Sequence, residues 1–534
     1  MIDGPSVAIL ADDLIWAARL DRLVRDAGAH PAPLRSLDAL DVALATGSRP
    51  SGLIVDLTSR TYPGLEAIRR AAAAGVPVVA VGQHHDRVGR DAARAAGAGD
   101  VYAYGRLFAS GPRVMGAWVR GLSGAAVSST LAQAGTARAA TGVSAAEGAS
   151  GDFGIPAERH RARLQAAQAG LRRAGGRSLL VGVGADLRWL TGYDAMNLER
   201  LTMLVLPRDG DPVLLVPRLE ASRASLAPAA AAGIVRIVTW QETEDPIALV
   251  SGLLPVARRE AHETLLVSDR LWASFVLRLQ EAFPAVPFGL ASEVLRELRI
   301  TKDADEIALL RSAAHAADRV VLAVAAARLV GRAEADVARE VRERLLDEGH
   351  ETAAFAIVGS GPNSASPHHE ASDRRIVAGE PVVLDIGGAY HGYGSDTTRT
   401  IWVAGVDEVQ PDGVFERLYG VLREAQSAAT DAVRPGVPAE RIDAVGRGII
   451  ERGGFGPAFI HRIGHGIGLE EHEDPYLVSG NGELLRQGCA FSVEPGIYLE
   501  GRYGARIEDI VVCAQEGPDV LNEVTRELLS VRGV

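Results

Sequence analysis

Five residues in the last third of the chain combine metal-binding side chains with apolar or glycine-rich, strand-like surroundings: Asp385, Asp396, His465, Glu494 and Glu508. Carboxylates repel one another and are costly to bury, so a fold that gathers four of them needs cations between them. One imidazole and four carboxylates supply mostly hard oxygen ligands, enough for two divalent ions that share bridging carboxylates. The sequence therefore predicts a buried site for two metal ions, of a kind that suits metal-assisted hydrolysis.

The first two acids lie in one glycine-rich segment. Asp385 is in PVVLDIGG, and Asp396 follows in YGSDTTRTI. A turn at the glycines between them would pair the two stretches as antiparallel strands, with both carboxylates on one face. A single buried Asp is more often a capped or ion-paired residue, but two in one hairpin favour metal binding.

The segment HRIGHGIGLEEHE, residues 461–473, carries three histidines among glycines. Glycines let the backbone approach a ligand closely, and a hydrophobic core rarely contains so much imidazole. His461, His465 and His472 are therefore candidates for a functional site.

Glu494 in FSVEPGIY and Glu508 in YGARIEDIVV each stand inside an apolar, strand-like run, where an unpaired carboxylate would be costly to bury. Arg506 precedes Glu508 by two residues, so in one extended strand both side chains point to the same face. This spacing predicts that Arg506 orients a metal-binding carboxylate or grips a substrate carboxylate.

Length and composition limit the alternatives. The chain has 534 residues, of which 47% are hydrophobic, and a net charge of -12. This length predicts roughly three or four domains, and the acidic balance argues against broad binding to nucleic acid or anionic membranes. Cys489 and Cys513 lie in apolar runs and are expected to be buried, reduced thiols. No stretch is typical of a signal peptide or a membrane span, so we expect a cytoplasmic protein.

Residues 1–121 alternate short apolar strands with amphipathic helices. We expect strands at 7–10, 53–57, 76–81 and 100–104, and helices at 14–27 and 63–74. The alternation predicts a doubly wound parallel sheet, whose functional groups lie at the carboxyl ends of the strands. Asp12, Asp13 and Asp56 fall at these ends.

This placement of acids resembles a response-regulator receiver domain, in which the acids bind magnesium and the third-strand Asp accepts a phosphoryl group. A receiver usually has Ser or Thr after the fourth strand and Lys after the fifth, but here these places read Gly82-Gln83 and Gly105-Arg106. We therefore expect a receiver-like module that does not transfer phosphate. An α/β interaction or dimerisation domain is the alternative, and in either case a partner of unknown identity is expected.

Three further segments follow. Residues 122–152 are rich in Ala, Gly, Ser and Thr, which is typical of a flexible linker. Residues 153–298 begin with a helix at 156–174 and continue as α/β structure, with two strands around a turn at 209–211. Residues 299–534 begin with an amphipathic helix over 299–318, followed by a helix and then β hairpins that a helix pair at about 413–453 interrupts.

The order of the candidate metal ligands, Asp, Asp, His, Glu and Glu, resembles that of the pita-bread metallopeptidases. The same resemblance is carried by the segments GPNSASPHHE, HRIGHGIGLEEHE, EPGIY and ARIED. This family comprises methionine aminopeptidases, proline aminopeptidases and dipeptidases (prolidases), with creatinase as a metal-free relative. The resemblance covers residues 155–534 and includes an amino-terminal creatinase/prolidase domain that methionine aminopeptidases lack. It implies a multidomain α/β and α+β protein, a curved antiparallel sheet backed by helices around the site, a homodimer, and the proline-peptidase branch.

The resemblance also implies a role for each metal-binding residue. Asp385 matches the ligand of one ion and His465 that of the other, while Asp396 and Glu508 match the bridging carboxylates. Glu494 matches the carboxylate that both binds metal and takes a proton from the attacking water.

Further residues match positions that contact substrate in the family. His368 follows a proline, as the family histidine near the scissile amide does, and the adjacent His369 does not. His472 matches the family histidine that stabilises the tetrahedral intermediate. His461 and Tyr498 match the lining of the proline pocket. Glu471 is a departure, since proline peptidases more often have a small branched aliphatic residue there, and this changes the width and charge of the pocket.

Three hypotheses of function remain open from the sequence. The leading one is a peptidase that cleaves X-Pro bonds in dipeptides or at the amino termini of peptides, using two divalent ions, with manganese expected and cobalt, zinc or iron also compatible with the ligands. The second is a hydrolase or lyase of a small non-peptide amide on the same scaffold. The third is a binding module without activity, which the intact ligand set disfavours.

Overall fold

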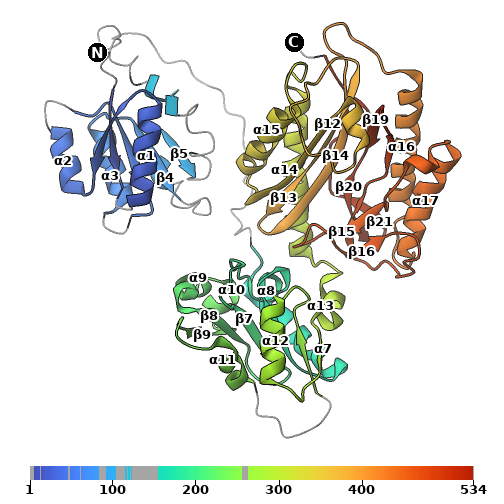
Figure 1. Cartoon of the computed structure of the whole chain (residues 1–534), viewed down its shortest axis with the longest axis horizontal. Helices are drawn as coiled ribbons and strands as arrows, with labels where there is room; N and C mark the ends of the chain where they lie inside the picture. The colour runs from blue at the N-terminus through green and yellow to red at the C-terminus, as the bar shows by residue number, and fades with distance from the viewer. Residues whose placement is uncertain are drawn as a thin grey trace. The chain divides into compact units, whose positions relative to one another are not determined.

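The computed structural model describes residues 5–11, 14–45, 49–59, 62–82, 92–103, 154–254 and 263–532, together with positions 107, 115–116, 118–120 and 122. Asp12, Asp13, Gln83, Gly105, Arg106 and the 122–152 linker beyond its first residue lie outside the described residues. The chain forms two compact units, Met1–Ala149 and Ser150–Val534 (Figure 1).

The first unit contains a five-stranded sheet in which every neighbouring pair is parallel, in the order β2-β1-β3-β4-β5. Apolar side chains cover both faces of this sheet, which explains why its central strands are continuous apolar runs. The predicted doubly wound parallel sheet is confirmed. Its elements are β1 (Ser6–Leu10), α1 (Leu14–Asp26), β2 (His30–Leu34), α2 (Leu37–Ala45), β3 (Gly52–Asp56), α3 (Gly64–Ala73), β4 (Val78–Gly82) and β5 (Asp100–Ala103).

Strand β2, with the sequence HPAPL, was not anticipated because proline has no N–H group for a β ladder. It lies at the edge of the sheet, where it pairs only with β1. The strand order places a topological switch point between β1 and β3, and Asp56 is the last residue of β3.

The second unit begins with a helix and a six-stranded mixed sheet, in the order β11-β10-β6-β7-β8-β9. Strands β7 and β8 are antiparallel around residues 209–211, as predicted, and Gly210 in the turn has a φ of 126°. The elements are α7 (Ala157–Ala174), β6 (Gly176–Gly182), α8 (Ala185–Thr191), β7 (Met203–Pro207), β8 (Val213–Pro217), α9 (Ala221–Ala224), α10 (Pro228–Ala231), β9 (Arg236–Trp240), α11 (Pro246–Leu253), β10 (Thr264–Val267), α12 (Ala273–Ala282), β11 (Phe288–Leu290) and α13 (Ser292–Arg299).

The remaining residues form two antiparallel-rich sheets and a two-stranded ribbon, backed by helices (Figure 1). One sheet has the order β12-β13-β14-β22, the other β16-β15-β17-β20-β21, and the ribbon is β18-β19. The strands are β12 (Thr352–Ser360), β13 (Glu380–Tyr390), β14 (Tyr393–Val403), β15 (Gly464–Gly466), β16 (Glu473–Leu477), β17 (Ala490–Val493), β18 (Gly496–Leu499), β19 (Tyr503–Arg506), β20 (Asp509–Ala514), β21 (Gly517–Val520) and β22 (Leu529–Val531).

Four helices support these sheets: α14 (Ala304–Ala325), α15 (Glu334–Asp347), α16 (Gly413–Asp431) and α17 (Ala439–Arg452). Helix α14 begins with a capping box, because the Asp303 side chain accepts from the backbone of Glu306 and the Glu306 side chain accepts from the backbone of Asp303. The predicted helix pair is confirmed, and the predicted amphipathic helix is present, but it begins at Ala304 and not at residue 299, because Arg299 ends α13 and Asp303 caps α14.

Arg299 joins the two parts of the second unit, next to the chain's only lysine. Lys302 donates to Glu473 at 2.7 Å, and Arg299 donates to the same carboxylate at 2.5 Å and to Asp186 at 2.7 Å. These contacts tie the six-stranded sheet domain to the segment that carries His472.

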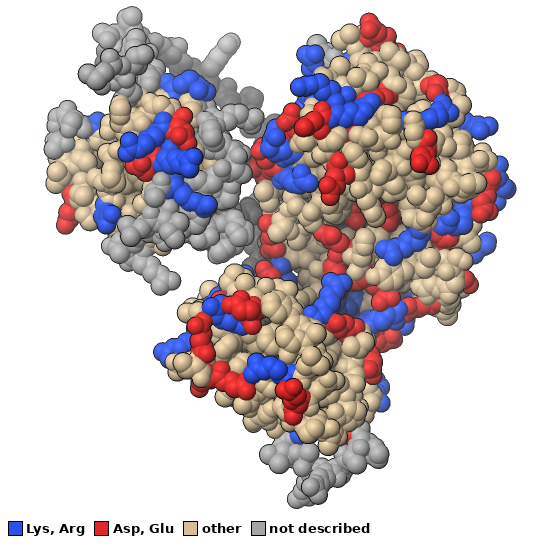
Figure 2. Space-filling model, in the orientation of Figure 1, with Lys and Arg blue, Asp and Glu red and all other residues tan. Residues whose placement is uncertain are grey.

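The described residues also bear on the predictions for the two cysteines, for membrane-spanning helices and for surface charge. Cys489 and Cys513 are free and buried, as predicted. No described helix combines the length and the hydropathy that crossing a bilayer requires. On the face seen in Figure 2, the described acidic and basic side chains are interspersed, without a broad area of one sign.

Candidate metal centre and substrate site

The predicted hairpin places Asp385 and Asp396 on one face. Strands β13 and β14 are antiparallel, with Asp385 opposite Thr398 and Gly387 opposite Asp396. Residues 385 and 387 alternate to the same side, so the two carboxylates lie diagonally across the pair. Both are buried, at 7% and 5% exposure.

Glu494 and Glu508 reach the site from breaks between strands. Glu494 follows β17 and precedes β18, and Glu508 lies between β19 and β20. The expectation that each lies inside a strand is therefore wrong. At both positions the backbone passes between the large sheet and the ribbon, and the N–H groups of Glu494 and Glu508 donate to the backbone oxygens of Ile463 and Thr398.

His465, on β15, completes the cluster. Its Nε2 atom lies 3.3 Å from Glu494 Oε1 and 3.7 Å from Asp396 Oδ2. Asp396, His465 and Glu508 each offer a ligand atom within 4.8 Å of the others. The structure thus brings four of the five predicted ligands together directly, and Asp385 lies opposite Thr398, whose hydroxyl donates to Glu508.

The electrostatics of the cluster fit cations. Burial and the neighbouring carboxylates raise the pKa values of Asp396 and Glu508 well above their ordinary range, and burial raises the pKa of Glu494 to about 7 despite the charge of Arg506. Burial lowers the pKa of His465 to about 3, so its imidazole is neutral, as a metal ligand requires.

Two oxygen atoms in the cluster have no hydrogen-bond donor among the described residues: Asp385 Oδ1 and Glu508 Oε1, both buried. Unpaired buried carboxylate oxygens are costly, and divalent ions would satisfy them. The residues present therefore fit a metal centre held by Asp385, Asp396, His465, Glu494 and Glu508.

Arg506 connects the metal cluster to the expected proline pocket. Its guanidinium donates to Asp385, to the Thr398 hydroxyl at 3.1 Å and to the Tyr498 hydroxyl at 2.7 Å. The Tyr498 hydroxyl also lies 3.0 Å from His461 Nε2. The predicted pocket residues thus form one hydrogen-bonded chain that begins at a metal-binding carboxylate.

His368 and His369 have different surroundings. His369 Nε2 lies 2.8 Å from the carboxylate of Glu334, a residue with 0% exposure, whereas His368 is exposed and lines a pocket beside the site. Burial lowers the pKa values of His461 and His472, and the charge of His368 makes a smaller contribution in the same direction. This geometry agrees with the choice of His368 over its neighbour.

Glu334 fixes the loop that carries both histidines, and the sequence offered no signal for it. Its carboxylate accepts hydrogen bonds from the backbone and hydroxyl of Ser360, from Asn363, and from the backbone and hydroxyl of Ser372. These donors flank the loop on both sides of His368. Helix α15 thereby positions the loop through one buried anion.

His472 lies against His465, with 3.9 Å between their ring centroids, and its side chain is exposed. Glu471, the departure from the family pattern, is also exposed as a whole, and partial desolvation of its carboxylate by neighbouring atoms raises its pKa. An acid therefore stands next to a histidine at the mouth of the site.

Thr398 and Arg399 are further residues that the sequence analysis missed. The Thr398 hydroxyl donates to Glu508 at 2.7 Å, and Arg399, at 0% exposure, donates to the Glu508 backbone oxygen at 2.6 Å and to Asp509 at 2.6 Å. Both residues follow Asp396 in SDTTRT, so a hydrogen-bonding run after a metal ligand was the available signal.

Comparison with known proteins agrees with this geometry. The model of metallopeptidase family M24 matches residues 308–515, and the creatinase/prolidase N-terminal domain matches residues 163–301. A probable dipeptidase PepE of Mycobacterium tuberculosis is 45% identical over 379 residues, which cover 70% of this chain and 97% of that protein.

Solved structures show the same similarity. Dipeptidase PepE from Mycobacterium ulcerans is 43% identical with a TM-score of 0.66, and the match covers 71% of this chain and all of that one. A prolidase from Thermococcus sibiricus is 34% identical with a TM-score of 0.63, covering 70% of this chain and 99% of that one. The residues before 163 lie outside both family models.

Proposed function

We propose that this chain, which belongs to metallopeptidase family M24, hydrolyses the bond before proline in X-Pro dipeptides or at the amino termini of X-Pro peptides. The observation that carries the proposal is the buried cluster of four carboxylates and one neutral imidazole, joined through Arg506 to Tyr498 and His461. The similarity to a prolidase supports the preference for proline.

The proposed centre holds two divalent ions, with manganese as the expected metal. Asp396 and Glu508 would bridge the ions, and Asp385 and His465 would bind one each. When bound, the ions polarise the scissile carbonyl and make water nucleophilic near neutral pH. The ligand types also accept cobalt, zinc or iron.

The chain's own residues would handle protons and position the substrate. Glu494 has 16% side-chain exposure, so its carboxylate reaches the open side of the cluster, where it can take a proton from water and return it to the leaving nitrogen. His368 and His472 would supply donors for a developing oxyanion. His461 and Tyr498 would contact the proline ring.

Kinetics with the manganese-loaded chain test this proposal. We expect turnover of Ala-Pro or Ala-Pro-Ala that exceeds turnover of Ala-Leu and Ala-Leu-Ala by at least about a hundredfold. A preference for the dipeptide identifies a dipeptidase and a preference for the tripeptide an aminopeptidase. Equal hydrolysis of the leucine peptides, or turnover of cyclic or acylated amino acids alone, would overturn the proline specificity while leaving the metal centre intact.

For the domain organisation we propose a receiver-like module at 1–121, a linker at 122–152, a creatinase-type domain at 153–298 and the catalytic domain at 299–534. In the first module the Asp56 carboxylate accepts from both the backbone and the hydroxyl of Thr58, at 2.8 and 2.7 Å, and has 0% exposure. An acid held and buried in this way is poorly placed to accept a phosphoryl group, which supports a docking or dimer-control role. A homodimer is part of the proposal.

A further inference from the structure

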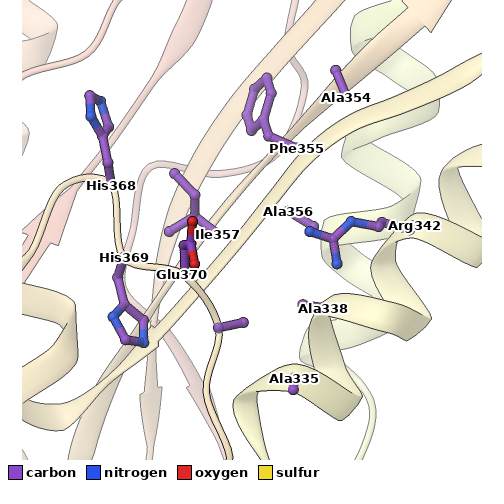
Figure 3. Close-up of a pocket in the computed structure, with 11 residues that line it drawn as sticks. Ala335, Ala338, Arg342, Ala354, Phe355, Ala356, Ile357, His368, His369 and Glu370 are labelled. Atoms are coloured by element: carbon purple, nitrogen blue, oxygen red, sulfur yellow. The ribbon is translucent and has the colours of Figure 1, made fainter.

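A pocket of about 390 Å³ lies along the edge strand β12 of the catalytic domain (Figure 3). Its walls come from helix α15, from residues 354–357 of β12, and from the loop 368–371. The volume is within the range of small-molecule sites. None of the proposed metal ligands lines it.

The pocket wraps around the edge strand β12, so its lining comes from both faces of the sheet: helix α15 packs against the face that carries Ala356, and Phe355 and Ile357 belong to the other face. Ile357 lies directly opposite Asp385, and Phe355 lies opposite Gly387, so their side chains are on the side of the metal-binding carboxylates. Phe355 and Ile357 remain partly exposed, although both are large and apolar. His368, which is proposed to act at the scissile amide, lines the pocket as well.

The pocket contains one cationic and one anionic side chain without a partner in the part of the chain that the structure describes. Arg342 and Glu370 are exposed, and neither forms an ion pair or a hydrogen bond with the described residues. By contrast, Arg339 and Arg344 on the same helix pair with Asp336 and Glu340. Figure 3 shows Arg342 extending from α15 toward the side of the pocket where Glu370 and Ile357 lie.

We propose that this pocket receives the amino-terminal residue of the substrate and prefers an acidic side chain there. Arg342 binds the side-chain carboxylate, Glu370 binds the free α-ammonium group, and Phe355 and Ile357 contact the methylene groups between them. An amino-terminal Glu or Asp carries both complementary charges. This inference rests on the proposed peptidase function, but it does not depend on proline at the second position.

The test compares substrates that differ only in charge. The metal-loaded chain is assayed on Glu-Pro and Gln-Pro, and in parallel on Glu-Leu and Gln-Leu. We expect kcat/KM to favour each Glu peptide by about fivefold, the scale of a partly exposed ion pair. The ratio should fall to near one in Arg342→Gln and stay unchanged in Arg339→Gln, a matched exposed arginine on the same helix. Glu370→Gln should lower kcat/KM for Glu and Gln peptides alike.

The outcomes separate this inference from the proposed function. Hydrolysis of the leucine peptides alone would contradict proline specificity, and the Glu to Gln ratio would still test the pocket. If no dipeptide is cleaved, calorimetry with L-glutamate and L-glutamine gives the same comparison, and Arg342→Gln should weaken only the binding of glutamate. A ratio near one in the unmodified chain, or a preference that survives Arg342→Gln, would overturn the assignment.

Discussion

Arg506 donates hydrogen bonds to the carboxylate of Asp385 and to the hydroxyl of Tyr498, so one guanidinium joins a proposed metal ligand to a residue of the proposed proline pocket. Lysine keeps the charge but cannot make several fixed contacts at once. We expect Arg506→Lys to lower kcat/KM about a hundredfold with at most a small loss of metal. Arg502→Lys, at an exposed position of the same ribbon, is the control. An Arg506→Lys enzyme of normal activity would contradict a connecting role.

Asp396 is expected to bridge the two ions. Asp396→Asn preserves the shape of the side chain and removes its negative charge, so metal content measured by atomic emission should fall from two ions per chain to one or none. Activity should fall by more than about a hundredfold. Asp407→Asn, an exposed position beyond the same strand, should behave like the unmodified chain. Retention of two ions in Asp396→Asn would refute the bridging assignment.

His368 and His369 provide a matched pair for substitution by glutamine. His368→Gln should reduce kcat by about a hundredfold or more, because the flexible glutamine side chain does not hold its donor at the reacting amide in the position of the imidazole N–H. In His369→Gln the amide can still donate to Glu334, so the loop should stay in place and kcat should change by less than about tenfold. The opposite ranking, measured at saturating substrate, would assign the catalytic role to His369.

His350 predicts a loss of stability in acid. It is buried between Leu345 and Ser395, and burial lowers its pKa to about 4, from 6.5 in the unfolded chain. The unfolded state therefore binds more protons between these values, so stability is full above pH 6.5 and is lost as pH falls toward 4, by about 3 kcal/mol for this residue. Urea unfolding of the chelator-treated protein from pH 7 to 4.5 should show a shallower decline in His350→Gln than in the unmodified chain.

Asp56 should not be phosphorylated. Incubation with acetyl phosphate and magnesium, followed by mass spectrometry, is expected to leave the residue unmodified, because Thr58 occupies one carboxylate oxygen and the side chain is fully buried. Stable, magnesium-dependent addition of a phosphoryl group at Asp56 would show that the module is an active receiver.

The sequence was sufficient for the hairpin and for the helices because these follow from local patterns. Asp385 and Asp396 lie in runs whose glycines and apolar alternation predict strands and a turn, and β13 and β14 pair as expected. The apolar spacing of α14 predicted a helix in the same way, but not its start, which the capping box of Asp303 and Glu306 sets. Each of these features depends on residues close in the chain.

The supporting residues could not be predicted, because their roles depend on contacts between distant segments. Glu334 is an ordinary acid in a helical pattern until Ser360, Asn363 and Ser372 surround it. The local pattern also gave a wrong prediction at Glu494 and Glu508. The apolar run around each residue suggested one continuous strand, but at both residues the backbone passes between a sheet and the ribbon.

The pairing of Lys302 with Glu473 has a consequence for the surface. Since this is the only lysine and its ammonium group is buried, the side-chain cations on the surface of the protein are almost all guanidinium groups, which stay protonated far above pH 10. Alkaline solution, which removes positive charge from a lysine-rich surface, should leave the arginine ion pairs of this protein in place.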